Sequence, residues 1–357
     1  MKRNTWISLL LAFCVALAGA AAAEGRSSDP QETAAPVVPL LDLPAQEGGT
    51  LLNFPVEEDQ LQTVITPGDE FYLYPEEGGE AVGYADPSVT VNIGRGRIYE
   101  TDYMYARVKI ATPTQLRARL ASPASTKQAA PGHDLAKRVQ AVIAINGDFC
   151  GGTDNLKGAL MRQGQKIRMK CDERYDILVI DRAGDFHILP SAKNEDVEPW
   201  MEKAANIFTF GPGLVIDGVP QYGLRLGRIA SHRPAQRMAI CQTGELEYLL
   251  ITSEGPENAG SVGLTLEQFI DLVSSIPGVQ NAYNLDGGSS STMVFRLEGN
   301  NWRKVNALSS KKIRPLKDII YFVTAWEPDE PVETEAPAET GEPGTEAEAA
   351  PEAETAP

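Results

Sequence analysis

One short stretch combines residue types that suit the binding of an anionic ligand. Asp286 is followed by Gly287, Gly288, Ser289 and Ser290. The glycines remove side chains, so backbone N–H groups can approach a ligand closely, and successive amides in such a turn form an anion-binding concavity. The carboxylate would repel the same anion, so Asp286 is expected to face another part of the substrate, such as sugar hydroxyls or an anomeric carbon. The structural alternative is that Asp-Gly-Gly makes a tight turn.

Other polar groups stand at the ends of apolar runs. They are Asn146, Gly147 and Asp148 after 139–145, Gly211 after 207–210, Arg237 before 238–241, Glu254 after 248–252, and Asn284 within 282–285. Nearly continuous apolar strands are covered on both faces, so their ends open at an edge of a sheet, where functional loops are usually built. The structural alternatives stay open, because Asn-Gly-Asp is a good turn sequence and a lone arginine beside a strand often makes only a salt bridge or a cap. Arg314 precedes the final apolar run and is expected near the same edge.

Short β-rich runs recur through the middle of the chain. We expect strands at 88–93, 106–110, 139–145, 177–180, 207–210, 214–216, 238–241, 248–252, 282–285, 293–295 and 319–323. Many strands with few helices predict an α+β fold, with mixed β-sheets and a few packed helices in a single catalytic domain at 86–326.

Two segments have helical patterns. The first covers 113–121, where two leucines are four residues apart. The second covers 266–276, where Thr265 and Gln268 form a capping box ahead of an apolar stripe. The stripe is expected to pack in the core.

The ends of the chain differ from its middle. Residues 1–23 have a basic start, an apolar run and a closing Ala-Ala-Ala, as in a secretory signal peptide. The run is also just long enough for an uncleaved membrane anchor, although its small-residue end favours cleavage. Residues 24–50 are expected to be a Pro/Gly-rich linker, 51–85 an ordered lead-in or small subdomain, and 327–357 a disordered tail with eleven acidic and no basic residues. We therefore expect a protein that is secreted or held in the cell envelope, with no membrane insertion after signal cleavage.

The composition limits the class of partner. Of the 357 residues, 42% are hydrophobic, which is enough for a sizeable core, and the net charge is −17. This acidity argues against nucleic-acid binding, which requires clustered Lys and Arg. Outside the signal segment, Cys150, Cys171 and Cys241 allow one disulfide, for which Cys150–Cys171 is the expected pair, and one buried thiol at Cys241. The cysteine spacing and three histidines do not match a zinc site, so neither a metal nor a cofactor is expected.

Five motifs occur in the order in which a known family carries them. They are AINGDF at 144–149, GPGLVIDG at 211–218, QRMAICQ at 236–242, SVGLTLEQF at 261–269 and NLDGGSSSTMVF at 284–295. Together they resemble the phosphodiester glycosidase family over roughly 86–326. The sequence departs from the family at Met238 and Cys241 in its PRTAIG pattern, at Ser289 in its DGGGSS pattern and at Pro256 in its DGR pattern. These departures are similar to those of a bacterial, exported branch.

The resemblance implies hydrolysis of a sugar-1-phosphodiester at the glycosidic C–O bond, which gives a free sugar and a phosphomonoester. Phosphoglycans of the cell wall or of exopolysaccharides are the expected substrates. Catalysis then depends on stabilising phosphate charge and an oxocarbenium-like sugar. Arg237, always cationic and bidentate toward phosphate, fits the first task. The amides and hydroxyls of 287–290 are expected to share it.

Three carboxylates are candidates for the anomeric centre. Asp286 is expected to act as nucleophile or base, Asp148 as its partner or as a sugar ligand, and Glu254 is the third candidate. Asn146 and Asn284 are expected to hold sugar hydroxyls or an acetamido group, and Gly211 to contribute to the substrate site.

Two other functions stay open. A non-catalytic carbohydrate- or cell-wall-binding protein would keep the sugar-contacting Asn and Asp residues without an intact acid pair. A metal-dependent phosphoesterase would use Asp148, Asp286 and Asn146 as oxygen ligands to Ca²⁺ or Mg²⁺. Turnover of a sugar-1-phosphodiester separates a glycosidase from the first alternative, and EDTA treatment separates it from the second.

Overall fold

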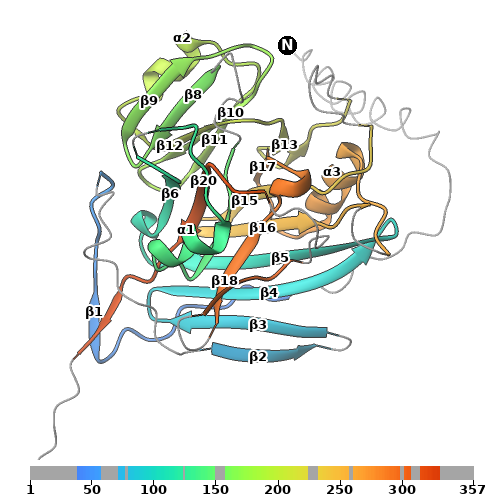
Figure 1. The fold of residues 1–357 in the computed structure, drawn as a ribbon. Coiled ribbons are helices and arrows are strands. Elements are labelled where there is room, and N and C mark those ends of the chain that lie inside the picture. Colours follow the sequence, from blue (N-terminus) through green and yellow to red (C-terminus); the bar gives the residue numbers. More distant parts are fainter. Residues whose placement is uncertain are drawn as a thin grey trace, which may run out of the picture.

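The computed structural model describes residues 38–57, 71–76, 79–123, 125–148, 157–223, 232–256, 260–297, 301–306 and 314–329. The expected signal peptide at 1–23 and the acidic tail beyond 329 lie outside these ranges. Strands dominate the described residues, which form three large sheets and one two-stranded ribbon (Figure 1).

The largest sheet has nine strands in the order β14-β13-β17-β15-β16-β5-β4-β3-β2. Its strands are β2 (Phe71–Glu76), β3 (Gly79–Asp86), β4 (Val89–Ile98), β5 (Thr101–Ile110), β13 (Gly213–Ile216), β14 (Val219–Pro220), β15 (Met238–Gly244), β16 (Glu247–Ser253) and β17 (Asn281–Leu285). Strand β3 pairs with β4 from Val82 to Asp86, so this part of the 51–85 segment extends the main sheet.

Two five-stranded sheets complete the framework. The first has the strand order β19-β18-β7-β20-β6, with β6 (Leu116–Leu120), β7 (Ile143–Asn146), β18 (Met293–Leu297), β19 (Asn301–Lys304) and β20 (Asp318–Phe322). The second has the strand order β11-β10-β12-β8-β9, with β8 (Gly158–Arg162), β9 (Gln165–Lys170), β10 (Ile177–Asp181), β11 (Phe186–Leu189) and β12 (Ala204–Thr209). The ribbon pairs β1 (Gly49–Leu51) with β21 (Trp326–Pro328).

Helices are few and short. They are α1 (Gly132–Arg138), α2 (Asn194–Val197) and α3 (Leu266–Ser275), with 3₁₀ turns η2 (Pro113–Gln115), η3 (Glu198–Trp200) and η4 (Gly288–Ser290). None of the helices in the described residues has the length and apolar character needed to cross a bilayer.

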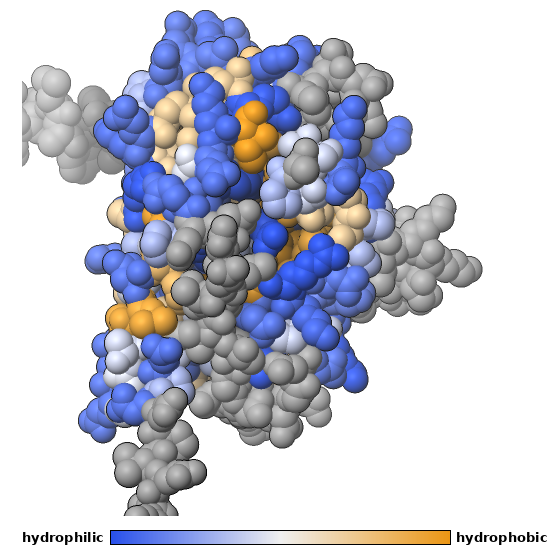
Figure 2. All heavy atoms as spheres, turned by 60° about the vertical axis from the view of Figure 1, so that its left-hand side comes forward, coloured by the Kyte–Doolittle hydropathy of each residue, from blue (hydrophilic) through white to orange (hydrophobic). Residues whose placement is uncertain are grey.

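The core lies between the nine-stranded sheet and the two smaller ones. In β15, Met238 and Ile240 join this central cluster, whereas Ala239 and Cys241 point to the opposite face and pack with α3. Successive residues of a strand alternate between its two faces, so an unbroken apolar run such as 238–241 covers both. The face shown in Figure 2 is mostly hydrophilic, and its apolar residues form small separate patches.

The expected strands all fall within or overlap observed strands, but the predicted helix at 113–121 is wrong. After η2, residues 116–120 form strand β6 and pair with β20. Leu116 and Leu120 are indeed four apart, but Ala118 between them is buried as well, and arginines occupy the alternate positions. The period is therefore two, which places the apolar residues on one face of a strand.

The sheets also differ from the mixed sheets that the sequence suggested. Every pairing among the described strands is antiparallel, from β2 with β3 to β20 with β7. Parallel neighbours need long crossover connections, usually helical, and the helices here are too few and too short to supply them. The coarser prediction of many strands with few helices is confirmed.

The cysteines differ partly from expectation. Cys241 is buried and free, as the sequence suggested. Cys171 is also a free thiol in the structure, and Cys150, its expected disulfide partner, lies outside the described ranges.

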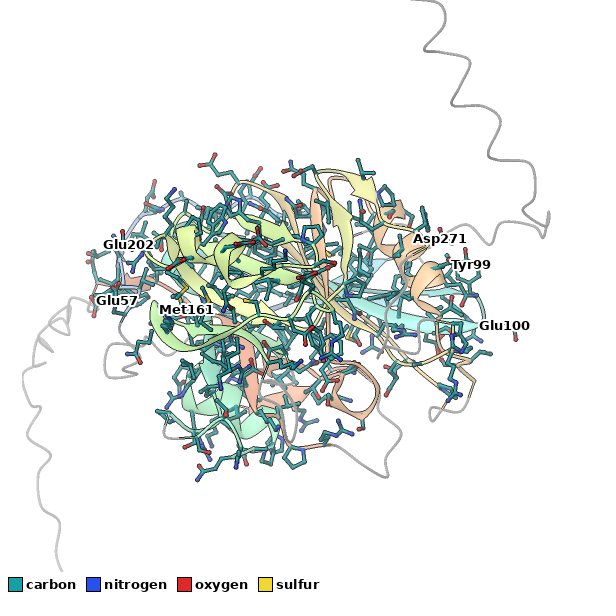
Figure 3. All side chains as sticks on the ribbon, turned by 90° about the horizontal axis from the view of Figure 1, so that it is seen from above. Glu57, Tyr99, Glu100, Met161, Glu202 and Asp271 are labelled. Atoms are coloured by element: carbon teal, nitrogen blue, oxygen red, sulfur yellow. The ribbon has the colours of Figure 1, made fainter. Side chains whose placement is uncertain are left out.

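The second predicted helix is confirmed as α3. Thr265 Oγ1 accepts a hydrogen bond from the Gln268 N–H at 3.2 Å, and Gln268 Oε1 accepts one from the Thr265 N–H at 2.9 Å. Asp271 of α3 accepts a hydrogen bond from the Tyr99 hydroxyl in the β4–β5 turn, which connects the helix to that turn. Figure 3 shows Tyr99 and Asp271 together at one end of the molecule, opposite Glu57 and Glu202.

The capping box gives a first prediction. Thr265→Ala should lower the free energy of unfolding by about 1 kcal/mol, because an N–H in the first turn of α3 loses its acceptor. Urea denaturation of purified protein measures this. Thr265→Ser keeps the hydroxyl and should retain most of the stability; equal losses in both variants would contradict a capping role.

Candidate active site

Three strand ends meet around one cavity. The C-terminal end of β7, the loop after β17 and the segment that enters β20 enclose a volume of about 200 Å³. Its lining consists of Asn146, Gly147, Asp148, Asp286, Ser290, Arg314, Pro315, Leu316, Lys317 and Asp318. The structure therefore brings together four of the candidate site residues selected from sequence, which are Asn146, Asp148, Asp286 and Ser290, and it places Arg314 there as well, as expected.

Asn146 holds the loop that carries Asp286. Its Nδ2 donates to the Asp286 carbonyl oxygen at 2.7 Å, and its Oδ1 accepts from the Thr292 N–H at 3.0 Å. The Asn146 N–H donates to the Thr292 carbonyl at 3.1 Å. Both ends of the side-chain amide are thus bound to backbone, so Asn146 acts as a positioning residue, where the sequence suggested a sugar ligand.

Asp286 lies at the cavity with a neighbouring hydroxyl and a guanidinium. Burial raises the pKa of Asp286 above its ordinary value, while a hydrogen bond from Ser290 and the positive charge of Arg314 act in the opposite direction. Arg314 Nη1 lies 3.5 Å from Ser290 Oγ, and the Arg314 N–H donates to the Ser289 carbonyl at 3.3 Å. The carboxylate and the cation are therefore coupled through one serine.

The glycine turn does not present its amides as a free anion cradle. The Gly288 N–H donates to the Gln236 carbonyl at 3.0 Å, and the N–H groups of Ser290 and Ser291 donate back into the turn. A Cβ on Gly287 would lie 2.5 Å from the Gln236 carbonyl oxygen. The absence of a side chain at Gly287 thus allows the turn to pack closely against the segment before β15. Here the close approach of the two backbones serves packing of the chain and not an anion.

Arg237 is not one of the residues that line the cavity. Its Nε donates to the Leu264 carbonyl at 3.0 Å and its Nη2 to the Arg233 carbonyl at 2.9 Å. Burial lowers the pKa of Arg237 to about 10, so it stays cationic at neutral pH. The structure points its guanidinium at backbone carbonyls, and Arg314 and Lys317 supply the positive charge at the cavity.

Six more of the selected residues also lie outside the lining. Glu254 accepts a hydrogen bond from Gln236 Nε2 at 3.4 Å, and the Gln236 carbonyl accepts the Gly288 N–H of the glycine turn. Asn284 Nδ2 donates to the Gly211 carbonyl at 2.8 Å, so these two expected substrate-binding residues bind each other. Gly287, Gly288 and Ser289 belong to the glycine turn but do not line the cavity.

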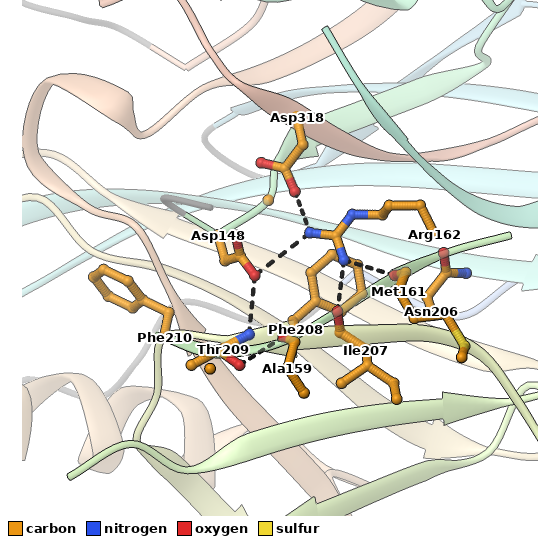
Figure 4. Close-up of polar contacts among 12 residues, drawn as sticks. Asp148, Ala159, Met161, Arg162, Asn206, Ile207, Phe208, Thr209, Phe210 and Asp318 are labelled. Atoms are coloured by element: carbon orange, nitrogen blue, oxygen red, sulfur yellow. Dashed lines mark hydrogen bonds and ion pairs between the residues drawn. The ribbon is translucent and has the colours of Figure 1, made fainter. Parts of the chain in front are cut away.

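A buried cluster of charges formed by Asp148, Arg162 and Asp318 (Figure 4) lies beside the cavity, and its two aspartates belong to the lining. Arg162, from β8, donates through Nη2 to Asp318 Oδ2 at 2.5 Å and lies 3.4 Å from Asp148 Oδ2. The exposed fractions of the three side chains are 5% for Arg162, 1% for Asp318 and 0% for Asp148. The guanidinium also stacks over the Phe208 ring at 4.0 Å.

The sequence analysis missed Arg162 and Asp318. Asp318 stands directly before the apolar run 319–323, so a polar residue at a strand end was the available signal. Burial raises the pKa of Asp318, and the negative charge of Asp148 adds to the effect, whereas Arg162 lowers it. No group of three or more His, Cys, Asp or Glu side chains with metal-binding geometry occurs among the described residues.

The sequence of the chain matches the model of one protein family, Phosphodiester glycosidase, over residues 139–323. The chain belongs to the phosphodiester glycosidase family. The matched segment contains every residue that lines the cavity, together with Arg162. No curated protein matches the chain by sequence.

One of the similar solved structures superposes with a TM-score above 0.5, and two others superpose less well. The catalytic domain of zebrafish N-acetylglucosamine-1-phosphodiester α-N-acetylglucosaminidase, auto-inhibited by its pro-peptide, superposes with a TM-score of 0.52 at 16% identity, covering 71% of this chain and 87% of that one. A hypothetical protein from Synechocystis gives 0.47 at 16% identity, covering 69% and 64% of the two chains. A putative exported protein from Burkholderia pseudomallei gives 0.42 at 13%, covering 62% and 74%.

Gly147 gives a prediction about how this glycosidase-family cavity is built. A Cβ at position 147 would collide with the Asp318 carboxylate. Gly147→Ala should therefore lower the free energy of unfolding by about 1–3 kcal/mol through overpacking. In an Asp318→Ala background the same change should cost less, with a coupling of at least about 0.5 kcal/mol in a double-mutant cycle followed by urea denaturation. Equal costs in the two backgrounds would contradict the packing of Gly147 against Asp318.

Proposed function

We propose that this member of the phosphodiester glycosidase family hydrolyses the glycosidic C–O bond of a sugar-1-phosphodiester, releasing a free sugar and a phosphomonoester. The observation that carries the proposal is the coupling of a carboxylate and a guanidinium at one cavity, through Asp286, Ser290 and Arg314. The reaction develops positive charge at the anomeric carbon and negative charge on the phosphate, so a site needs both signs of charge side by side.

Arg314 is the proposed phosphate ligand, with Lys317 as a second positive charge. An arginine forms two parallel hydrogen bonds to a phosphate, and its charge persists at all working pH values. This role was expected at Arg237, but the Arg237 guanidinium donates to two backbone carbonyls. Asp286 faces the anomeric carbon as nucleophile or base, and its raised pKa makes it a stronger base than an ordinary aspartate.

The size of the cavity supports a small sugar substrate. Its volume of about 200 Å³ lies below the roughly 300–1,000 Å³ of pockets that enclose drug-sized ligands. A single sugar unit with its phosphate at the mouth suits this volume better than an oligosaccharide segment. We therefore propose that a terminal sugar-1-phosphate linkage is cleaved. The signal-peptide-like residues 1–23 support a location outside the cytoplasm, where phosphoglycans of the wall or of exopolysaccharides are the substrates.

A substrate panel tests the proposed function. Purified protein is incubated with α- and β-linked sugar-1-phosphodiesters of several sugars, and free sugar and phosphomonoester are measured. Turnover is expected with at least one linkage, and Asp286→Asn should lower kcat by at least about 100-fold because the carboxylate is lost. Asp271→Asn, on the exposed side of α3, is the matched control and should retain full turnover. Binding without turnover across the panel would favour the carbohydrate-binding alternative.

A pair of arginine variants tests where the phosphate binds. Arg314→Lys should raise KM about tenfold or more, because a fork of two charged hydrogen bonds is replaced by a single ammonium. Arg237→Lys should leave KM nearly unchanged and lower the melting temperature instead, since its contacts are to backbone carbonyls. The reverse pattern would place the phosphate at Arg237 and overturn the assignment to Arg314.

A further inference from the structure

Two buried carboxyl groups share one guanidinium beside the cavity. Asp148, Arg162 and Asp318 are each at most 5% exposed in their side chains. If both carboxyls were ionised, the cluster would carry an excess negative charge in a medium of low dielectric constant, which is costly. A buried pair of carboxyls near one cation therefore favours retention of one proton. The contacts of the two aspartates indicate which of them holds it.

Asp148 has the contacts of an ionised carboxylate. Its Oδ2 accepts the Thr209 N–H at 2.9 Å and lies 3.4 Å from the Arg162 guanidinium. Hydrogen bonds that donate to a carboxylate stabilise its charged form. The Asp148 carboxylate therefore has a backbone amide and an arginine as its neighbours at Oδ2, and it is poorly placed to act as the partner of Asp286 that the sequence suggested.

Asp318 has one occupied and one open oxygen. Its Oδ2 accepts from Arg162 at 2.5 Å, whereas its buried Oδ1 has no hydrogen-bond partner in the structure. An ionised oxygen without a donor is unfavourable in the interior, whereas a protonated one becomes a hydrogen-bond donor, and Asp318 is one of the residues that line the cavity. The absence of a side chain at Gly147 lets the Asp318 carboxyl reach this position.

We propose that Asp318 carries a proton on Oδ1 at neutral pH and is the general acid that delivers it to the departing phosphate. The inference rests on the proposed function and adds a catalytic residue to it. Arg162 is the positioning residue that fixes the carboxyl. The other charged groups that face the cavity are Asp286, Arg314 and Lys317.

The proposed step balances in atoms and charge. The C1–O bond breaks with its electron pair moving to the phosphate oxygen, and the phosphate takes the proton of Asp318. Water adds to C1 and gives one proton to the Asp286 carboxylate. The proton then returns from Asp286 to Asp318 through solvent, so one water is consumed per turnover. A phosphomonoester has a second pKa of about 6, so an acid whose pKa lies above the usual aspartate range is matched to this leaving group.

Infrared spectroscopy locates the proton independently of any substrate. The wild-type protein at pH 6 should show a protonated carboxyl C=O band that Asp318→Asn lacks. Retention of the band in Asp318→Asn would overturn the proposal. If Asp318→Asn does not fold, Asp318→Glu decides: a band shifted in frequency supports a proton at position 318, and an unshifted band refutes it.

Kinetics test delivery of the proton. On the sugar-1-phosphodiester that the wild type cleaves, Asp318→Asn should lower kcat by about 100-fold or more. In the wild type, kcat should fall as pH rises through the raised pKa of Asp318, because the acid form is lost, and Asp318→Asn should lose this alkaline limb. A glycosyl fluoride of the same sugar, whose leaving group needs no proton, should be cleaved at a similar rate by both proteins.

The two levels of inference fail separately. An unchanged alkaline limb in Asp318→Asn, or an equal loss on the fluoride and the phosphodiester, would overturn the role of Asp318 while leaving the proposed function intact. Absence of turnover with every sugar-1-phosphodiester would overturn the proposed function, and the infrared comparison would still decide where the proton resides.

Discussion

A single buried arginine joins the parts of this protein that form the cavity. Arg162 belongs to β8 of one small sheet, whereas Asp148 and Asp318 belong to the end of β7 and the start of β20 in the other. A charge in the interior requires compensation, because an unpaired buried ion costs several kcal/mol. The guanidinium therefore holds both carboxyls close to itself. In this way it connects β8 of one sheet to the ends of β7 and β20 in the other.

The cavity depends on this junction and on the loop after β17. Asn146 binds that loop through its side-chain amide, and Asn306 binds it again by accepting the Met293 N–H and donating to the Ser291 carbonyl. Asp286 is consequently carried on a loop whose backbone is bound by β7 and by the segment that follows β19. A carboxylate held in this way keeps one orientation, which is the condition for a catalytic group to act on a small substrate.

Much of the fold was predictable because its signals are local. Each expected apolar run lies in or overlaps a strand, and the Thr265–Gln268 capping box marks the start of α3. The segment 113–121 was misread because two residues that are four positions apart lie on the same face of a helix and also on the same face of a strand. Pairing of β6 with β20 decided the matter, and that partner lies about two hundred residues away in sequence.

The sequence by itself determined the family resemblance, the strand-rich fold and the polar strand ends. Motifs and apolar periodicity depend only on residues that are close together in the sequence. It selected Asn146, Asp148, Asp286 and Ser290 correctly as neighbours of one cavity. Only the tertiary structure decided that Arg237 donates to backbone carbonyls, that Asp318 lines the cavity, and that Arg162 pairs with Asp318. Side-chain direction and burial depend on contacts between distant segments, and no local pattern encodes which of several arginines and aspartates will converge.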